Sequence, residues 1–222
     1  MTYHDTGMQG LPSLLQIGDP APNFQARTTQ GEISLSDYRG NWVLLFSHPA
    51  DFTPVCTSEF LALARANERF EALNCRLLAV SVDSLYSHLA WIRAIRDQFG
   101  VTIPFPVIED PSVVIGEAYC MINETAPDAA TMRSTFFIDP EGIIRAILCY
   151  PATIGRSVEE MLRILAALQK VDRDQVLTPE GWQPGDDILL SPHQDQTGML
   201  EAEDGGNCWF YRPQPDQKKG AL

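Results

Sequence analysis

One cysteine of the chain lies in a setting that could make its thiol react, within the segment SHPADFTPVCTSEF. Thr53 precedes Cys56 by three residues, so on a helix the hydroxyl and the sulfur would share one face. Thr53 is also a suitable N-cap, and Pro54 suits the first helical position, which places Cys56 third in the helix. Free backbone N–H groups and the positive end of the helix dipole favour a thiolate there. Pro49 bends the chain as it enters this segment.

The other four cysteines lack this setting, and burial is the default explanation for a free cysteine. Cys75 and Cys149 lie in apolar strand patterns and are expected in the core, and Cys120 closes a short helix and is expected to be inert. No two cysteines have C-x-x-C spacing, and no His/Cys cluster has the spacing of metal ligands. We therefore expect no metal site, no cofactor and no dithiol redox motif.

The elements around Cys56 are a strand and a helix. Residues 42–48, WVLLFSH, have the bulky and β-branched composition of a buried strand and follow the turn signal RGN. A helix should follow, with one face apolar and the other facing water. The apolar set is Phe60, Leu63, Ala64 and Phe70, and the polar set is Glu59, Arg65, Glu68 and Arg69. Cys56 would then lie at the edge of an α/β sheet where ligands usually bind.

The rest of the chain continues this alternation. The pattern predicts strands at 75–82 and 105–110, a hairpin over 134–150 that turns at residues 140–142, and helices at 84–99, 112–119 and 157–170. Gly100 would end the second helix, and S-V-E-E at Ser157 is a capping box for the last. This order predicts an α/β layered fold with a mixed sheet. After residue 172 the chain is rich in Pro, Gly and Asp, so we expect a small extension with little regular structure.

Composition excludes several classes of partner. A net charge of −13 and a pI near 4.6 argue against nucleic acid and against an anionic membrane surface. The sequence has neither the basic start and apolar run of a signal peptide nor a membrane-length apolar segment. Five widely spaced cysteines are too few for a disulfide scaffold. We therefore expect a cytoplasmic protein with reduced thiols.

Several motifs together resemble one known family. Residues 49–59, PADFTPVCTSE, carry the P-x-x-x-T-x-x-C signature of the peroxiredoxins (the AhpC/TSA superfamily), and SHPADFTPVCTSEF resembles their one-cysteine subfamily, the peroxiredoxin six type. The motifs MRSTFFIDPEG, CYPATIGRS, TPEGWQPGDDILL and FYRPQP follow in order, so the resemblance covers about Leu15 to Pro215. It implies a thioredoxin-like fold, with helices flanking the mixed sheet, over residues 1–172 and a small C-terminal peroxiredoxin domain over 173–222. It also implies a thiol-specific peroxidase for hydrogen peroxide and organic hydroperoxides, serving antioxidant defence and cell redox homeostasis.

The resemblance assigns catalytic roles residue by residue. Cys56 matches the peroxidatic nucleophile, Thr53 the residue that donates to or orients the peroxide, and Pro49 the residue that shields the thiolate. Arg133, which opens RSTFFID, resembles the arginine that pairs with the sulfur and the peroxide. A lowered pKa alone gives a modest gain in thiolate, and nucleophilicity falls with pKa. Most of the acceleration is therefore expected from donors that stabilise charge as the O–O bond breaks, the role expected of Thr53 and Arg133.

Three further residues resemble supporting groups, each with an ordinary alternative. Glu59 and Arg156, in TIGRS, resemble the pair that holds the arginine and cysteine in place, and His48 matches the histidine before the proline. Arg133 and Arg156 could each instead be a surface charge, because arginine is usually exposed. His48 could equally be a core histidine held by hydrogen bonds.

Regeneration requires a second thiol, because the expected product on Cys56 is a sulfenic acid. Cys208, just before WFYRPQP, is a candidate resolving cysteine across a dimer, and the alternative is an external thiol reductant such as a thioredoxin-like protein or glutathione. The resemblance implies a homodimer at least, and a decamer of five dimers is compatible with it.

Two rival classes of function remain open. One is a cysteine acyl hydrolase that uses Cys56 with His48, which would need a base within hydrogen-bond reach and an oxyanion site. The other is a chaperone or redox-signalling module. Phospholipase activity is not expected, because the lipase-like G-x-S-x-G motif of animal relatives is missing: Asn41 lies there and no serine.

Overall fold

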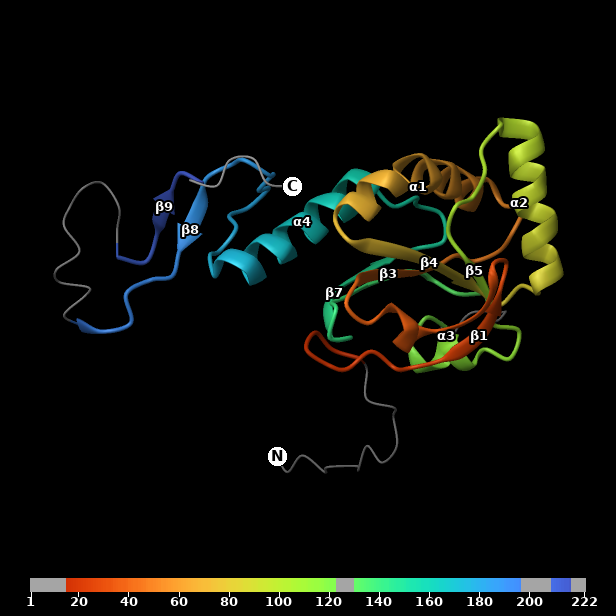
Figure 1. Cartoon of the computed structure of the whole chain (residues 1–222), viewed down its shortest axis with the longest axis horizontal. Helices are drawn as coiled ribbons and strands as arrows, with labels where there is room; N and C mark the ends of the chain where they lie inside the picture. Colours follow the sequence, from red (N-terminus) through yellow and green to blue (C-terminus); the bar gives the residue numbers. More distant parts are fainter. Residues whose placement is uncertain (1–14, 123–129, 197–208, 217–222) are drawn as a thin grey trace, which may run out of the picture.

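A seven-stranded sheet forms the centre of the larger part of the protein. This part lies to the right in Figure 1, and β8 (Ile188–Leu190) and β9 (Arg212–Gln214) lie apart from it on the left. The computed structural model describes residues 15–122, 130–196 and 209–216. The strands lie in the order β2-β1-β5-β4-β3-β6-β7. Their bounds are β1 Gln25–Thr28, β2 Gly31–Ser34, β3 Trp42–Ser47, β4 Cys75–Ser81, β5 Val107–Glu109, β6 Arg133–Ile138 and β7 Ile144–Tyr150. The strand that leads to Cys56, β3, is therefore near the middle of the sheet.

The sheet is mixed, as the sequence predicts. β3 pairs in parallel with β4, and β4 in parallel with β5. β6 runs antiparallel to both β3 and β7, and β1 runs antiparallel to β2 and β5. The antiparallel pairing of β6 to β3 brings residues of the 130s beside the end of β3, although they are far apart in the sequence.

Helices cover both faces of the sheet (Figure 1). Within the described residues they are η1 Leu35–Tyr38, α1 Pro54–Ala72, α2 Leu85–Phe99, α3 Val114–Ala118 and α4 Val158–Asp174. One core cluster joins the sheet to α1, α2 and α4 through Phe60, Leu63, Trp91, Ile95, Met161 and Leu165. A second cluster, on the opposite face, includes Leu35 from η1 and Ile115 from α3. The fold is thus a thioredoxin-like α/β layered structure.

Local signals place the ends of several elements where the sequence predicts them. The Ser84 hydroxyl caps α2, and Gly100 ends it with a φ of 67°, a left-handed conformation that suits glycine. Gly142 adopts a φ of 83° in the turn between β6 and β7. The capping box at Ser157 is only half formed. The Ser157 hydroxyl accepts from the backbone N–H of Glu160, but the Glu160 carboxylate pairs with Arg163 and not with the backbone N–H of Ser157.

Two small strand pairs were not predicted. The β1–β2 hairpin forms near the start of the described chain, in four-residue strands with mixed burial that give a weak alternation signal. In the extension, β8 (Ile188–Leu190) pairs with β9 (Arg212–Gln214) over three residues each. Proline and aspartate dominate the sequence around these strands, which hides such short pairing.

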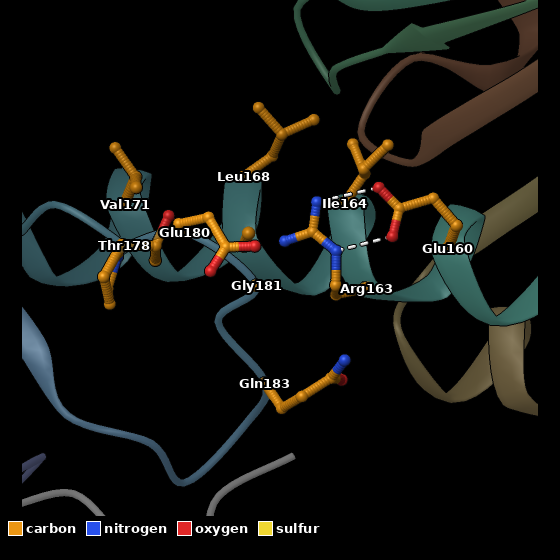
Figure 2. Close-up of a pocket in the computed structure, with 11 residues that line it drawn as sticks. Glu160, Arg163, Ile164, Leu168, Val171, Thr178, Glu180, Gly181 and Gln183 are labelled. Carbon is orange, nitrogen blue, oxygen red and sulfur yellow. Dashed lines mark hydrogen bonds and ion pairs between the residues drawn. The ribbon is translucent and has the colours of Figure 1, made fainter.

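The extension begins where α4 ends and is held to that helix. Lys170, on α4, is buried and donates to Asp216 at 2.7 Å and to Asp174 at 2.8 Å. A groove of about 670 Å³ lies where α4 faces residues 178–183. Figure 2 shows its lining residues, with Glu160 paired to Arg163 at one side. None of the groove's lining residues belongs to the segment around Cys56. Within the described ranges, every helix is too short or too polar to cross a membrane.

Candidate active site

Cys56 lies in the first turn of α1, directly after the loop that leaves β3. Its side chain is fully buried. Pro54 occupies the start of the helix, as predicted, and Thr53 occupies the N-cap position. The sulfur therefore lies near the positive end of a 19-residue helix, where backbone N–H groups lack helical partners.

Arg133 comes from β6 and faces the cysteine. Its Nη1 is 3.4 Å from the Sγ of Cys56, and its side chain is buried. Nε and Nη2 both donate to the carbonyl oxygen of Ala152, at 3.0 and 2.8 Å. These bonds fix the plane of the guanidinium, so one N–H group is held toward the sulfur. The alternative of a surface charge is wrong for this arginine.

Glu59 links the two predicted arginines. One carboxylate oxygen, Oε2, accepts from Arg133 Nη1 at 2.8 Å and from Arg156 Nη2 at 2.8 Å. The other, Oε1, accepts from the backbone N and the Nε of Arg156. Burial opposes ionisation of Glu59, but the hydrogen bonds and charge of Arg156, with the charge of Arg133, outweigh it and lower its pKa.

Helical periodicity predicts that Glu59 faces water, whereas the family motif predicts that it supports the site. The pattern of α1 groups this residue with side chains that face water, yet it is buried. A buried carboxylate is stable here because two guanidinium groups and a backbone N–H satisfy it. Arg156 is buried as well, and its Nη1 donates to the Ser134 carbonyl oxygen at 2.9 Å.

The loop before the helix differs from expectation in one detail. The Thr53 hydroxyl does not cap α1; it donates instead to the carbonyl oxygen of Ala50 at 2.9 Å. With its proton committed, this hydroxyl offers lone pairs, so a ligand O–H would donate to it. Pro49 is half-buried in the same loop. Phe52 is 59% exposed and has a φ of 56°, a strained left-handed conformation for a bulky residue.

His48 is a core histidine that lies directly before this loop. It is fully buried, and its Nε2 is 2.9 Å from Asp51 Oδ1. Burial lowers the pKa of His48, against the opposing effect of Asp51. The same carboxylate is 2.8 Å from the Nδ1 of His88, on α2. Imidazole and carboxylate groups also bind transition metals, but these separations are those of hydrogen bonds.

Asp51 and His88 are the residues that sequence reasoning missed at this site. Asp51 lies between Pro49 and Thr53 of the signature. An acidic residue inside this loop could have indicated that it has a role at the site. His88 lies on the buried side of α2, together with Trp91 and Ile95. A titratable residue on an otherwise apolar helix face could have indicated a functional or structural role. Neither could be paired with the other from spacing alone, because 37 positions separate them.

The remaining cysteines differ in their exposure. Cys75 is buried as predicted, and burial raises the pKa of its thiol to about 12. Cys149 is exposed, so its predicted place in the core is wrong: it lies on β7, the edge strand of the sheet, most of whose residues are only partly buried. Cys120 is partly buried, just after α3. Cys208 lies outside the described residues.

The fold and this site define a class: a thioredoxin-like protein with a cysteine-based site at the start of a helix. Comparison with family models places the chain within that class. The AhpC/TSA family model matches residues 17–147, and the model for the C-terminal domain of 1-Cys peroxiredoxin matches residues 167–205. The chain belongs to the AhpC/TSA family, the peroxiredoxins, which are thiol-dependent peroxidases that act on peroxides with a thiol reductant.

Relatives and solved structures agree with this assignment. A peroxiredoxin of Methanosarcina mazei is 43% identical over 91% of this chain and 99% of its own, and peroxiredoxin 2 of Caldanaerobacter subterraneus is 50% identical over 89% and 91%. The structure of a yeast mitochondrial 1-Cys peroxiredoxin matches with a TM-score of 0.82 and 37% identity, over 91% of this chain and 100% of that one. That structure was described as the basis of a thiol resolving mechanism via glutathione and thioredoxin systems. The structure of a cysteine-to-serine mutant of peroxiredoxin 6 of Arenicola marina matches with a TM-score of 0.79 and 30% identity. The match covers 91% of this chain and 99% of that one.

Proposed function

We propose that the chain reduces hydrogen peroxide and organic hydroperoxides at Cys56. The thiolate attacks one peroxide oxygen, the O–O bond breaks, and the leaving oxygen takes a proton to become water or an alcohol. Cys56 becomes a sulfenic acid, so sulfur is oxidised by two electrons and the peroxide is reduced by two. In the cell this activity would serve antioxidant defence and redox homeostasis.

The contact between Arg133 and Cys56 carries this proposal. A guanidinium N–H held 3.4 Å from the sulfur can stabilise negative charge there, before attack and on the departing oxygen. The carboxylate of Glu59 and the Ala152 carbonyl fix that group, so little reorganisation is needed during the reaction. Arg156 supports the arrangement by bonding both carboxylate oxygens of Glu59.

Thr53 and Pro49 would complete the site. Because the Thr53 hydroxyl donates to Ala50, it is suited to accept the O–H of a bound hydroperoxide and so orient the oxygen under attack. Pro49 lacks an N–H and lies in the same loop, where it would limit water near the sulfur.

Regeneration completes the proposed cycle. A second thiol attacks the sulfenic acid, releases water and forms a disulfide, which a further thiol then reduces. The second thiol would be Cys208 or an external thiol such as glutathione or a thioredoxin-like protein. The yeast mitochondrial 1-Cys peroxiredoxin, which this chain resembles, is described with thiol resolution via glutathione and thioredoxin systems. We also propose a homodimer, with a decamer as the larger assembly, in the cytoplasm. The division into domains 1–172 and 173–222 is part of the same proposal.

The acyl hydrolase alternative is less well supported. His48 would have to act as the base for Cys56, but its Nε2 is engaged by Asp51 and the ring is fully buried. The group that faces the sulfur is a guanidinium, which is a poor base and a good partner for an anion. This arrangement favours peroxide chemistry at Cys56.

A titration with hydrogen peroxide tests the proposal. The reduced protein should lose one thiol rapidly and in proportion to added peroxide, and Cys56→Ser should abolish that loss. Cys149→Ser is the matched control, because it removes an exposed thiol and should leave the fast phase unchanged. Fast peroxide consumption by the Cys56→Ser protein would contradict the assignment. Non-reducing gels of wild type and Cys208→Ser then separate the two sources of the resolving thiol.

A further inference from the structure

The loop between β3 and α1 is anchored by Asp51. Its backbone N–H donates to Asp83 Oδ2 at 2.9 Å, which ties the loop to the segment after β4. Its carboxylate lies between two histidine rings, His48 at the start of the loop and His88 on α2. Asp51 and both histidines are buried. The loop is therefore joined to the end of β4 and to α2 through one residue.

The hydrogen bonds of His88 require a proton on each ring nitrogen. Nε2 is 3.2 Å from the carbonyl oxygen of Ile108, which can only accept. Nδ1 is 2.8 and 3.0 Å from the two carboxylate oxygens of Asp51. Since Asp51 is held in its ionised form, it too can only accept. The ring is thus an imidazolium, and its charge is balanced by the carboxylate beside it.

The same carboxylate sets the tautomer of His48. Its Nε2 donates to Asp51 Oδ1, and burial, which lowers the pKa of His48, keeps this ring neutral. The proton is then on Nε2 and the lone pair on Nδ1, which has no hydrogen-bond partner among the described residues. Asp51 consequently accepts from two rings at once. Burial opposes its ionisation, but these hydrogen bonds outweigh it and hold its pKa well below the usual range.

This anchor lies directly before the strained residue of the loop. Phe52, with its φ of 56°, follows Asp51, and Thr53 follows Phe52. A left-handed bulky residue persists only where its surroundings impose it. The bonds to Asp51 supply that constraint from three sides, so the position of Thr53 relative to Cys56 depends on them.

We propose that His88 is a positioning residue for the peroxidase reaction: as a buried imidazolium paired with Asp51, it holds the loop so that Thr53 faces the reacting sulfur. The hydrogen bonds of the His88 ring go to Asp51 and Ile108, so its effect on Cys56 is exerted through Asp51. The inference rests on the proposed function for its catalytic consequence, whereas the ion pair is a structural claim that stands independently.

Variants of His88 test the catalytic consequence. An asparagine can place its amide N–H near the position of Nδ1, so His88→Asn keeps a donor to Asp51, whereas His88→Leu removes it. We expect His88→Leu to slow the reaction of Cys56 with peroxide by about tenfold to a hundredfold, the scale of a misplaced reacting group. His88→Asn should recover most of that loss. Tyr119→Phe is the matched control, since it removes a part-buried hydrogen bond from Tyr119 to the Pro22 carbonyl oxygen, on the other face of the sheet.

A second readout separates positioning from general damage. Alkylation of Cys56 by iodoacetamide needs the thiolate but not Thr53, so His88→Leu should change it by less than about threefold. Equal losses in both reactions, or an unchanged peroxide rate in folded His88→Leu protein, would overturn the positioning role. A loss in the Tyr119→Phe control as large as in His88→Leu would overturn it as well.

The ion pair is tested directly in the unmodified protein, so this measurement needs no variant to fold. Nitrogen-15 NMR of the histidine rings at neutral pH should give two protonated nitrogens for His88, and for His48 a protonated Nε2 with a bare Nδ1. A neutral His88 ring would overturn the inference. If wild-type Cys56 failed to react with peroxide while His88 proved cationic, the proposed function would fail and the ion pair would stand.

Discussion

The guanidinium of Arg133 lies 3.4 Å from the sulfur of Cys56, although 77 positions separate these residues in the sequence. The antiparallel pairing of β6 with β3 creates this contact, because it brings the start of β6 to the end of β3 where α1 begins. Both side chains are buried, so water screens the interaction little. Substitutions of Arg133 and of the residues around it should therefore change the reactivity of the sulfur in distinct ways.

Replacing Arg133 should slow the attack on peroxide strongly. Arg133→Met removes the N–H held toward the sulfur, and loss of one such donor costs about a hundredfold to a thousandfold in rate. Arg133→Lys keeps a charge but cannot bond Ala152 and Glu59 with the same planar geometry, so its rate should be intermediate at best. Stopped-flow measurement of Cys56 oxidation gives the rate constants. A rate in Arg133→Met within about threefold of wild type would exclude the proposed role.

Thr53 should act through its hydroxyl and not through its shape. Thr53→Val keeps the branched side chain but cannot accept a hydrogen bond, and we expect its peroxide rate to fall by at least about tenfold. Thr53→Ser keeps the hydroxyl and should stay close to wild type. Because the hydroxyl does not cap α1 and, among the described residues, bonds only the Ala50 carbonyl oxygen, Thr53→Val should cost no more than about 1 kcal/mol of unfolding free energy. A large drop in the unfolding temperature would show that the hydroxyl has a structural role in the helix start.

Glu59 should make the protein sensitive to acid. Its pKa is lowered in the folded state from 4.5, so its contribution to stability is complete above that pH and is lost as the pH falls through the folded value. In Glu59→Gln the two buried arginines lose their shared carboxylate, which should cost about 3–5 kcal/mol of unfolding free energy at neutral pH. Urea unfolding across pH measures the difference between the two proteins.

That difference should shrink as the pH falls below 4.5, because protonated Glu59 resembles glutamine. A constant difference from neutral to acid pH would mean that the charge of Glu59 is not what stabilises the site. Glu141→Gln is a suitable control, since this exposed carboxylate lies in the turn after β6.

Lys170 should hold the extension to α4. Its ammonium group is buried and bonds Asp174 and Asp216, so Lys170→Met leaves two carboxylates without that partner. We expect a loss of about 3–5 kcal/mol and faster proteolysis at the extension than in the main sheet. Limited proteolysis followed by mass spectrometry locates the cuts. Equal cutting rates in wild type and variant would contradict this role.

Much of the fold around the site could be predicted from the sequence. β3 and β4 are largely continuous apolar runs, and Gly100 and Gly142 give local signals that the structure confirms. The signature around Cys56 depends on spacing within one helical turn, which is a local property. The strand pairs β1–β2 and β8–β9 were missed, because their three or four residues carry no clear periodicity.

The parts of the site that could not be predicted depend on long-range contacts. Helical periodicity placed Glu59 among exposed residues, since it cannot register two arginines that arrive from other elements. The ring of His88 meets Asp51 only because α2 packs beside the loop. Cys149 has an apolar strand context, yet exposure depends on whether another element covers β7. Spacing within the sequence contains none of this information.

Trapping of the sulfenic acid shows which cysteine reacts first with peroxide. Reduced protein is treated with one equivalent of hydrogen peroxide in the presence of dimedone, which adds to sulfenic acids, and each cysteine peptide is then quantified by mass spectrometry. We expect an adduct on Cys56 that grows in proportion to peroxide, with Cys75 and Cys149 unmodified. An adduct first formed on another cysteine, or none on Cys56 while peroxide is consumed, would contradict it.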